Sequence, residues 1–395
     1  MSIEELDIAI VGGGLAGGTL AMALRKHAPD LSCALFEAGD VYGGNHRWSW
    51  FEHDLDEDGA ALLEPFARTA WTGGNEVRFP GYSRRLESNY RSLDSRDFDA
   101  GIRRALPQEA IRTGARVVGL DGAGITLGTG ERIAARAVVD CRDALPSEHL
   151  AGGWQVFLGQ HLKTTAQHGI KRPVIMDATV NQPGAYRFVY LLPLGPDEIF
   201  VEDTYYADSP ELDAEILRQR IADYAAGKDW QFEIVHEETG VLPVITDGDF
   251  EAYRASLSTP GVTLAGARGG FVHPLTSYTV PIAVRNALAI ARAASDDIAA
   301  LPEFVDSRAK QHWRDTAYYR LLGKMLFQAA EPAERYRVFE RFYRLPEVLI
   351  SRFYAARSTL PDKLRILTGK PPVSVSRAIR ALLGKGAPLV QGKSP

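Results

Sequence analysis

The chain has 395 residues, of which 45% are hydrophobic and 24% are charged, and this is the composition of an ordinary folded globular protein. Its two cysteines, Cys33 and Cys141, lie far apart and lack metal-ligand spacing, so we expect no disulfide framework, no metal site and a cytoplasmic setting. The N-terminus lacks the pattern of a signal peptide, and no stretch approaches the roughly eighteen apolar residues of a membrane span.

The net charge of −5 is unevenly distributed along the chain. Residues 311–395 carry sixteen Lys or Arg against six Asp or Glu, so the rest of the chain is strongly acidic. Such a basic segment predicts an anionic partner surface, and the alternative is a helix with a solvated basic face.

The first predicted elements are a buried strand over residues 7–11 (DIAIV), a glycine-rich turn and a helix. The turn reads Gly12-x-Gly14-x-x-Gly17. In this pattern the first glycine allows a sharp turn, the second lets the backbone approach a pyrophosphate, and the third lets helix and strand pack closely. The spacing therefore predicts a phosphate cradle at the end of the strand.

Two further features extend this motif. LAMALRKH follows with helical spacing, and the helix N-terminus, which we expect to bring the backbone of Leu15 and Ala16 to the phosphates, supplies free N–H groups and a positive dipole end. A second strand, CALFEAG, ends in Glu37, which can accept hydrogen bonds from ribose hydroxyls. The whole order predicts a dinucleotide site, against the alternative of a glycine-rich turn without a ligand. The following AGDVYGGNHRWSW, with a second glycine pair and Arg47, favours FAD over NAD.

The next segment belongs to the first part of a predicted FAD-binding domain, which covers residues 1–150 with substrate-side insertions near 50–95. SLDSRDFDAGIRRAL predicts a helix with Ser95 as its N-cap. ARVVGLDGAGITLGTGERIAARAVVDCRD predicts a β-meander whose last strand returns the chain to the cofactor at Asp140.

Residues 151–240 predict a substrate-binding sheet and helix. The runs WQVFLGQHLKT, PVIMDA, YRFVYLLPLG and EIFVEDTYY are rich in aromatic and β-branched residues, which indicates an antiparallel sheet over a cavity. The stretch SPELDAEILRQRIADYAAGKDW predicts an amphipathic helix with Ser209 as N-cap and Pro210 as its first residue.

The remaining chain is expected to fall into three parts. Residues 241–310 predict a strand, a glycine turn and a long helix that return to the cofactor, through Gly266, His273 and Pro274. A hydrogen-bonded structural role for the histidine is the alternative. Residues 311–372 are expected to be helical and to contact a membrane, and residues 373–395 to form a mobile basic tail.

The chain resembles the bacterial lycopene beta-cyclases of carotenoid biosynthesis, up to about residue 375. The resemblance is carried by DIAIVGGGLAGGTLAMALR, GGNHRWSW, FVEDTYY, HPLTSYTVP and AERYRVFERFYRLPEVLISRFYAARSTLPDKLRILTGKPPV. The first stretch is shared by many flavoproteins, and the other four together are much more specific. The resemblance implies an α/β fold, in which a Rossmann-type FAD-binding domain carries an inserted antiparallel β-sheet substrate domain and a C-terminal helical segment.

Three positions depart from related patterns. Ser277 stands where this family commonly has glycine, and Cys141-Arg142-Asp143 replaces a turn that often closes with glycine. The Gly-Asp pair with which flavin hydroxylases contact the ribityl chain corresponds here to Gly266-Ala267. The first two departures affect fine geometry near the flavin, and the third argues against a hydroxylase.

The resemblance implies non-redox acid–base cyclisation of the linear ends of lycopene, through gamma-carotene to beta-carotene. It implies reduced FAD as the active cofactor, with NAD(P)H serving only as its reductant. The family's essential acidic motif falls on Glu202 and Asp203, in apolar and aromatic surroundings that should raise a carboxyl pKa. Strand alternation places Asp203 on the opposite face, as a partner or orienting group, and an exposed carboxylate pair is the alternative for both.

Aromatic rings could stabilise the cation of such a reaction, or simply pack; the candidates are Trp48, Trp50, Trp154, Tyr186 and Tyr190. The run RYRVFERFYRLPEVLISRFYAAR suits an interfacial helix on anionic lipid. We therefore expect peripheral attachment to the inner face of the cell membrane, contact with other carotenoid enzymes as a further partner class, and no nucleic-acid partner. The alternatives are a flavin-dependent hydroxylase or desaturase acting on a polyene, and a carotenoid carrier with a structural flavin.

Overall fold

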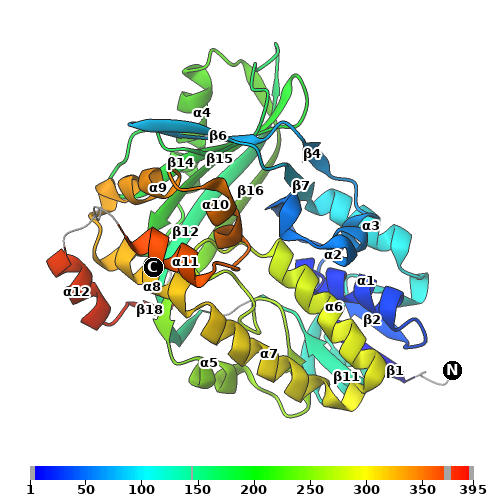
Figure 1. The fold of residues 1–395 in the computed structure, drawn as a ribbon. Coiled ribbons are helices and arrows are strands. Elements are labelled where there is room, and N and C mark those ends of the chain that lie inside the picture. The colour runs from blue at the N-terminus through cyan, green and yellow to red at the C-terminus, as the bar shows by residue number, and fades with distance from the viewer. Residues whose placement is uncertain (1–4, 144–145, 369–374, 391–395) are drawn as a thin grey trace.

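The computed structural model describes residues 5–143, 146–368 and 375–390 of the chain. Two large sheets form its frame, and helices pack around and between them (Figure 1). This arrangement confirms the predicted α/β fold, with a Rossmann-type unit, an antiparallel sheet and a C-terminal group of helices.

The first sheet has parallel strands at its centre. β1 pairs in parallel with β2 and with β11, and β17 pairs in parallel with β11. Its strands, in spatial order, are β8 (Ile111–Arg112), β2 (Cys33–Phe36), β1 (Leu6–Val11), β11 (Arg132–Asp140), β10 (Gly124–Leu127) and β9 (Val117–Asp121), with β17 (Val262–Leu264) beside β11. The central strands read as apolar runs because both of their faces are covered. α1 (Leu15–His27) and α6 (Val280–Asp296) pack together against this sheet (Figure 1).

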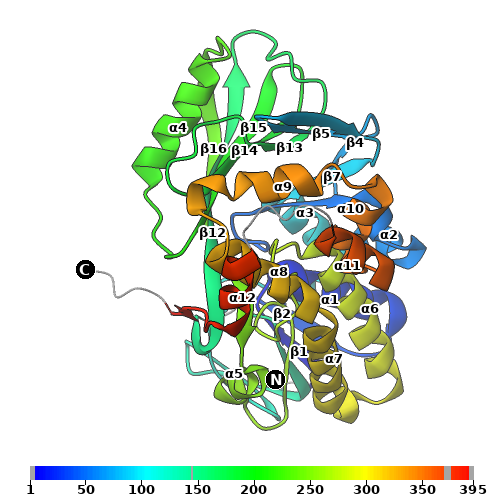
Figure 2. The same cartoon turned by 60° about the vertical axis from the view of Figure 1, so that its left-hand side comes forward.

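The second sheet is mostly antiparallel and holds the predicted substrate strands. In spatial order it contains β16 (Phe232–Gly248), β12 (Ser147–Thr164), β15 (Glu198–Ala207), β14 (Tyr186–Pro193), β13 (Val174–Asp177), β5 (Asn75–Phe79) and β6 (Tyr82–Leu86), with β18 (Pro388–Leu389) beside the start of β12. α4 (Ala214–Ala226) covers one face, where Leu217 and Ile221 pack on Leu158 and Val201. We call this the outer face, and the opposite one, which faces the C-terminal helices, the inner face (Figure 2).

A small third sheet joins the two units. It is made of β3 (Arg47–Phe51), β7 (Tyr90–Asp94) and β4 (Thr69–Trp71). The chain therefore leaves the first unit after β2, contributes β5 and β6 to the second sheet, and returns through α3 (Ser95–Ala105).

The C-terminal third is helical. Its helices, together with the shorter helices elsewhere, are α2 (Glu57–Leu63), α5 (Phe250–Leu257), α7 (Leu301–Asp315), α8 (Ala317–Gln328), α9 (Tyr336–Phe342), α10 (Glu347–Tyr354), α11 (Leu360–Leu367) and α12 (Val375–Leu383). The 3₁₀ turns are Glu52–Asp54, Gln108–Ala110, Ile298–Ala300 and Pro332–Glu334. None of the helices in the described part of the chain is both long and apolar enough to cross a bilayer.

Two predicted helix caps are wrong, although α3 begins at the expected residue. α3 begins at Ser95, but its cap is Asp94, whose carboxylate accepts a hydrogen bond from Asp97 N at 2.9 Å. α4 begins at Ala214 with Asp213 as its cap, several residues after the predicted start at Ser209. In both cases an aspartate caps the helix in place of the expected serine, because its carboxylate accepts strong hydrogen bonds from the free amides of the first turn.

The predicted mobile tail is partly structured. Pro388–Leu389 forms β18 against β12, and Leu389 is buried. The described part of the tail also contains α12, while residues 373–374 and 391–395 of that prediction lie outside the described residues.

Candidate active site

The glycine motif forms a close-packed cradle between β1 and α1. Gly12 has a φ of +101°, in the left-handed region that glycine adopts without strain. A Cβ on Gly17 would lie 2.0 Å from Gly12 O, so no other residue fits there. Nothing lies within 4 Å of a Cβ on Gly14, which leaves the open space through which a ligand's phosphates could approach.

The N-terminus of α1 presents free amides to this space. The first hydrogen bond of this turn runs from Gly18 N to Gly14 O, so the amides of Leu15, Ala16 and Gly17 have no intrahelical acceptor. The first turn contains no acidic residue that would repel a phosphate. Glycines, free amides and helix dipole together fit a pyrophosphate group.

Glu37 lies beside this cradle and holds it in shape. One carboxylate oxygen accepts from Gly13 N at 2.8 Å, and the other accepts from Gly39 N at 2.8 Å. Two oxygens with about four acceptor positions leave capacity for further donors. A ribose contact by Glu37 therefore stays a prediction. The structure adds a second role, in which Glu37 holds the glycine loop through its two backbone hydrogen bonds.

Asp140 and Gly266 lie on the other side of the cradle. β11 ends at Asp140, whose carboxylate accepts from Arg142 Nη2 at 2.7 Å and from Arg142 N at 3.1 Å. Gly266 has a φ of +58°, and a Cβ there would lie 2.8 Å from that of Ala16. The ends of three parallel strands and the start of α1 thus meet at one edge, where α/β sheets bind their ligands.

The loop that carries Arg47 connects this edge to the second sheet. Asn45 donates to Glu237 O at 3.0 Å, and its side-chain oxygen lies 2.6 Å from His236 Nε2. The guanidinium of Arg47 pairs with Asp94 at 3.1 Å and lies over the ring of Phe200, 5.3 Å from its centre. Arg47 therefore faces the inner face of the substrate sheet, and its contact with a cofactor stays a prediction.

Glu202 lies on the inner face, at the centre of the sheet. It pairs with Tyr190 of β14 on one side and with Gly159 of β12 on the other. Its carboxyl accepts from Thr204 Oγ1 at 2.5 Å. Burial raises the pKa of Glu202 to about 7, and the neighbouring Asp203 adds to this effect. A carboxyl group with such a pKa can both give and take a proton near neutral pH.

Asp203 lies on the outer face, where α4 covers it. It is fully buried and pairs with Arg187, with a closest N···O distance of 2.5 Å, while Arg220 lies 3.7 Å away. The alternation predicted this separation from Glu202, and a catalytic or orienting role for Asp203 stays a prediction. Its carboxylate is held in an ion pair under a helix.

Glu238 belongs to the same inner-face row and was missed by the sequence analysis. Gly159 of β12 pairs with Glu202 of β15 on one side and with Glu238 of β16 on the other, so it lies between the two glutamates. Glu238 is 4% exposed. Burial raises the pKa of Glu238 to about 8, and the nearby Glu202 raises it further. The signal in the sequence was HEETG, but it identifies a site only once the strand register is known.

His273 does not face the cradle with a free nitrogen. Its Nδ1 accepts from the amides of Leu275 and Thr276, both at 3.3 Å, and its Nε2 lies 3.2 Å from Phe353 O. Burial lowers the pKa of His273 to about 3, so the ring is neutral. These hydrogen bonds favour the structural alternative for this ring, and a cofactor contact by His273 stays a prediction. Pro274 accepts at its carbonyl from Ile245 N at 2.8 Å, and a cofactor contact there stays a prediction.

The aromatic candidates separate into two groups. Tyr190 lies on the inner face beside Glu202, and its hydroxyl donates to Tyr90 at 2.6 Å. Tyr186, on the same face, is fully buried against Phe339 with ring centres 4.3 Å apart. The predicted tryptophans pack instead in or against the hydrophobic core of the first unit; they are Trp48, Trp50 and Trp154.

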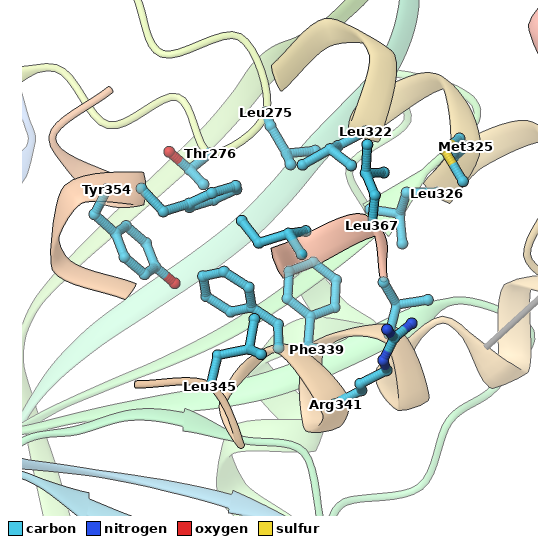
Figure 3. Close-up of a pocket in the computed structure, with 14 residues that line it drawn as sticks. Leu275, Thr276, Leu322, Met325, Leu326, Phe339, Arg341, Leu345, Tyr354 and Leu367 are labelled. Atoms are coloured by element: carbon cyan, nitrogen blue, oxygen red, sulfur yellow. The ribbon is translucent and has the colours of Figure 1, made fainter. Parts of the chain in front are cut away.

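A large apolar pocket opens among the C-terminal helices (Figure 3). It adjoins the aromatic wall, by which we mean the aromatic residues of the inner face around Tyr186 and Tyr190. Its empty volume, including the mouth, is about 960 Å³. The side chains around it are almost all apolar, among them Leu275, Leu322, Leu326, Phe339, Phe342, Leu345, Phe353, Tyr354, Ile366 and Leu367, with Arg341 as the charged member. Figure 3 shows Phe339 and Tyr354 projecting into it from α9 and α10. Such a pocket suits a hydrocarbon ligand.

Comparison with known proteins identifies the family of this chain. The sequence model of the family described as "Lycopene cyclase protein" matches residues 7–380. The chain is 45% identical to the lycopene beta-cyclase of Pseudescherichia vulneris, covering 95% of this chain and 97% of that protein. It is 38% identical to the lycopene beta-cyclase of Pantoea ananas, with 95% and 98% covered. The fold is similar to that of the flavin-dependent brominase Bmp2, with a TM-score of 0.60 and 15% identity over 89% of this chain and 94% of that one. The chain therefore belongs to the lycopene cyclase protein family.

Proposed function

We propose that this protein is a lycopene beta-cyclase, which closes the linear ends of lycopene into β rings to give gamma-carotene and then beta-carotene. The observation that carries the proposal is Glu202, a largely buried carboxyl group with a raised pKa, on an aromatic face beside the loop that follows the dinucleotide cradle. Family membership and the names of the two relatives support the choice of substrate.

The cofactor of this proposal is FAD, used in its reduced form. The cradle of Gly12, Gly14 and Gly17 and the free amides of α1 fit its pyrophosphate, and Glu37 has acceptor capacity for a ribose. When bound, a reduced flavin supplies electron density that favours a nearby cation. NAD(P)H is proposed only as the source of electrons for that reduction, because cyclisation itself changes no oxidation state.

Glu202 is the acid–base group of the proposed mechanism. Its protonated carboxyl gives a proton to the terminal double bond of the polyene, and a second double bond then attacks the resulting cation to close the ring. Loss of a ring proton to a carboxylate completes the reaction and restores the proton inventory of the protein. No atoms are gained or lost, so the product is an isomer of the substrate.

The surroundings of Glu202 protect such a cation. Tyr190, Tyr90 and Phe51 present aromatic surfaces on this side, with the Phe51 and Tyr90 ring centres 5.0 Å apart. Ring faces attract cations, and their bulk excludes water that would otherwise capture the cation. The pocket lined by Phe339 and Tyr354 adjoins this wall and is proposed to hold the hydrocarbon chain.

Access to a lipid-dissolved substrate is proposed to occur through the C-terminal helices. Leu360 and Leu364 of α11 are 70% and 56% exposed, whereas Ile366 and Leu367 of the same helix line the pocket. Exposed leucines flanked by basic residues such as Arg365 suit the surface of an anionic membrane. We therefore propose peripheral attachment to the inner membrane face, with the pocket mouth beside the lipid.

An anaerobic assay tests the proposed activity. The purified protein is mixed with lycopene in anionic liposomes, with FAD either oxidised or reduced by dithionite, and the products are identified by chromatography and mass. A β-ringed product of unchanged mass, formed only with reduced flavin and lost in Glu202→Gln, is the expected result. Oxygen-dependent NAD(P)H consumption without cyclised product would instead indicate a hydroxylase or desaturase. Unchanged carotenoid binding without turnover in any condition would indicate a carrier.

A further inference from the structure

The inner face of the second sheet carries two glutamates in one row rather than one. In an antiparallel sheet, residues that pair directly lie on the same face. Gly159 of β12 pairs with Glu202 of β15 and with Glu238 of β16, and the register is regular at this point. The two glutamates are therefore two strands apart, about 10 Å between their backbones, with a residue lacking a side chain between them.

Gly159 is required for this arrangement. A Cβ on Gly159 would lie 2.3 Å from Cζ of Phe200, whose ring fills the space above the glycine. The ring leaves no polar side chain between the two carboxyl groups, and Arg47 covers it from above. Glu202 and Glu238 thus share an environment of low polarity, in which the charge of Glu202 raises the pKa of Glu238.

The charged groups that face Glu238 do not neutralise it. Arg47 of β3 is the nearest cation, but it is paired with Asp94 of β7 at 3.1 Å. The backbone amide of Arg47 is a donor to Glu238, and Glu202 is the like-charged neighbour. Two histidines lie two residues from the row, His161 on β12 and His236 on β16, and burial lowers the pKa of each. Tyr190 on β14 has a raised pKa and is also neutral.

We propose that Glu238 is the second proton-carrying group of the cyclisation site and shares its dissociable protons with Glu202 across Gly159. The inference rests on the proposed cyclase function. Each ring closure needs one C–H bond formed from a carboxylic acid and one C–H bond broken with the proton passing to a carboxylate. With two carboxyls on one face, one holds the proton to be given while the other receives, and the pair regains its starting protonation after each ring.

The pKa values of the two glutamates are consistent with one carboxyl group giving a proton while the other receives one. They lie near 7 for Glu202 and near 8 for Glu238. A coupled pair of this kind loses its two protons in two steps that belong to the pair. Near neutral pH it therefore contains both an acid and a base, which a single carboxyl cannot provide at one moment.

The test compares three variants in the full-length, FAD-loaded protein. Glu238→Gln keeps the size of the side chain and removes its proton exchange. Glu238→Asp keeps the carboxyl group. Glu237→Gln is the matched control, because Glu237 is the next residue on β16, faces the other way and pairs with Arg218 at 2.6 Å. Flavin absorbance and thermal unfolding show for each variant whether the fold is retained.

The activity readout is the pH dependence of the cyclisation rate. We expect Glu238→Gln to lower kcat by roughly 10²- to 10⁴-fold and to reduce two apparent ionisations in the profile to one. Glu238→Asp should recover at least part of the rate, and Glu237→Gln should keep the wild-type profile. A Glu238→Gln protein with the wild-type rate and profile would overturn the proposal, while a wild-type protein without cyclase activity would overturn the proposed function instead.

A second readout does not depend on activity. Infrared difference spectroscopy across about pH 6 to 9 detects buried carboxyl groups that lose a proton in that range. We expect Glu202→Gln and Glu238→Gln each to lose one such group relative to the wild type, while the signal of the buried Asp54, whose pKa burial raises to about 7, remains in every variant. An unchanged signal in Glu238→Gln would overturn the proposal even if the variant had lost activity, because that loss would then be structural.

Discussion

The carboxylate of Asp203 lies 2.5 Å from a guanidinium nitrogen of Arg187, on the face of the sheet turned away from Glu202. Both side chains are buried. Removing one partner of a buried ion pair leaves the other charge uncompensated, which costs about 3–5 kcal/mol. We expect Asp203→Asn to lose free energy of unfolding on this scale, as measured by urea denaturation. Normal stability with abolished cyclisation would instead return Asp203 to the catalytic site.

Glu202 and Glu238 should make stability depend on pH in a defined direction. Their folded-state pKa values, about 7 and about 8, lie above the ordinary value of 4.5. The folded protein therefore binds more protons than the unfolded chain between these limits, and stability falls as pH rises through them. We expect the pH dependence of Tm between about pH 5 and 8 to flatten in Glu202→Gln. A slope identical to wild type would show that Glu202 is ionised at neutral pH.

Ser277 occupies a backbone conformation that suits glycine. Its φ is +53°, and its hydroxyl donates to Pro243 O at 3.1 Å. Ser277→Gly loses the hydrogen bond but relieves the strain, whereas Ser277→Ala loses the hydrogen bond and keeps the strain. We expect the glycine variant to be more stable than the alanine variant by about 1–2 kcal/mol. Equal unfolding free energies in urea would contradict a strained backbone at this position.

Gly17 and Gly14 should respond differently to the same substitution. A Cβ at Gly17 would collide with Gly12 O at 2.0 Å, while a Cβ at Gly14 meets nothing within 4 Å. We expect Gly17→Ala to disrupt the β1–α1 packing and lower Tm. Gly14→Ala should keep the wild-type Tm of the flavin-free protein and weaken FAD binding, as measured by quenching of flavin fluorescence. Unchanged FAD affinity in Gly14→Ala would place the pyrophosphate elsewhere.

The exposed leucines of α11 provide a test of membrane contact. The double variant Leu360→Ser with Leu364→Ser removes apolar side chains that are 70% and 56% exposed. We expect weaker flotation with anionic liposomes and an unchanged Tm, because no core contact is lost. Val118→Ser is the control, since Val118 is 64% exposed on β9 of the other unit. Equal flotation of all three proteins would exclude α11 as the contact.

These point substitutions are a sharper test than truncation after residue 370. A truncated chain also loses β18, whose buried Leu389 packs on β12. Weaker lipid binding in the truncated protein would therefore combine a lost surface with a damaged sheet.

Local patterns in the sequence predicted the glycine turn between the first strand and helix, and together with the resemblance they selected Glu202 as the candidate acid. The order of strand, glycines, helix and acid is a local pattern, and each part has a mechanical reason that the structure repeats at Gly12 and Gly17. Glu202 was predicted because its apolar and aromatic surroundings should raise a carboxyl pKa, and because the resemblance places the family's acidic motif there. Strand alternation also predicted the separation of Asp203, although its ion pair with Arg187 could not be read from the sequence.

The missed features depend on contacts between distant segments. Glu238 becomes part of the site only through the pairing of β16 with β12, and that register is set by packing across the sheet rather than by local pattern. His273 was assigned to the cofactor from its motif. Its hydrogen bond with the carbonyl of Phe353, eighty residues further along the chain, could not be predicted from that motif. The helix caps are Asp94 and Asp213 rather than the expected serines. They lie one to four residues from the predicted positions, and hydrophobic periodicity does not locate a helix end that closely.

The position of β18 also bears on where the protein tolerates an added segment. This strand continues the row of β15 along the start of β12, and its Leu389 is buried. If β18 were displaced, the start of β12 would present unpaired backbone groups to strands of other molecules. A fusion partner should therefore be tolerated better at the N-terminus than directly after Leu389.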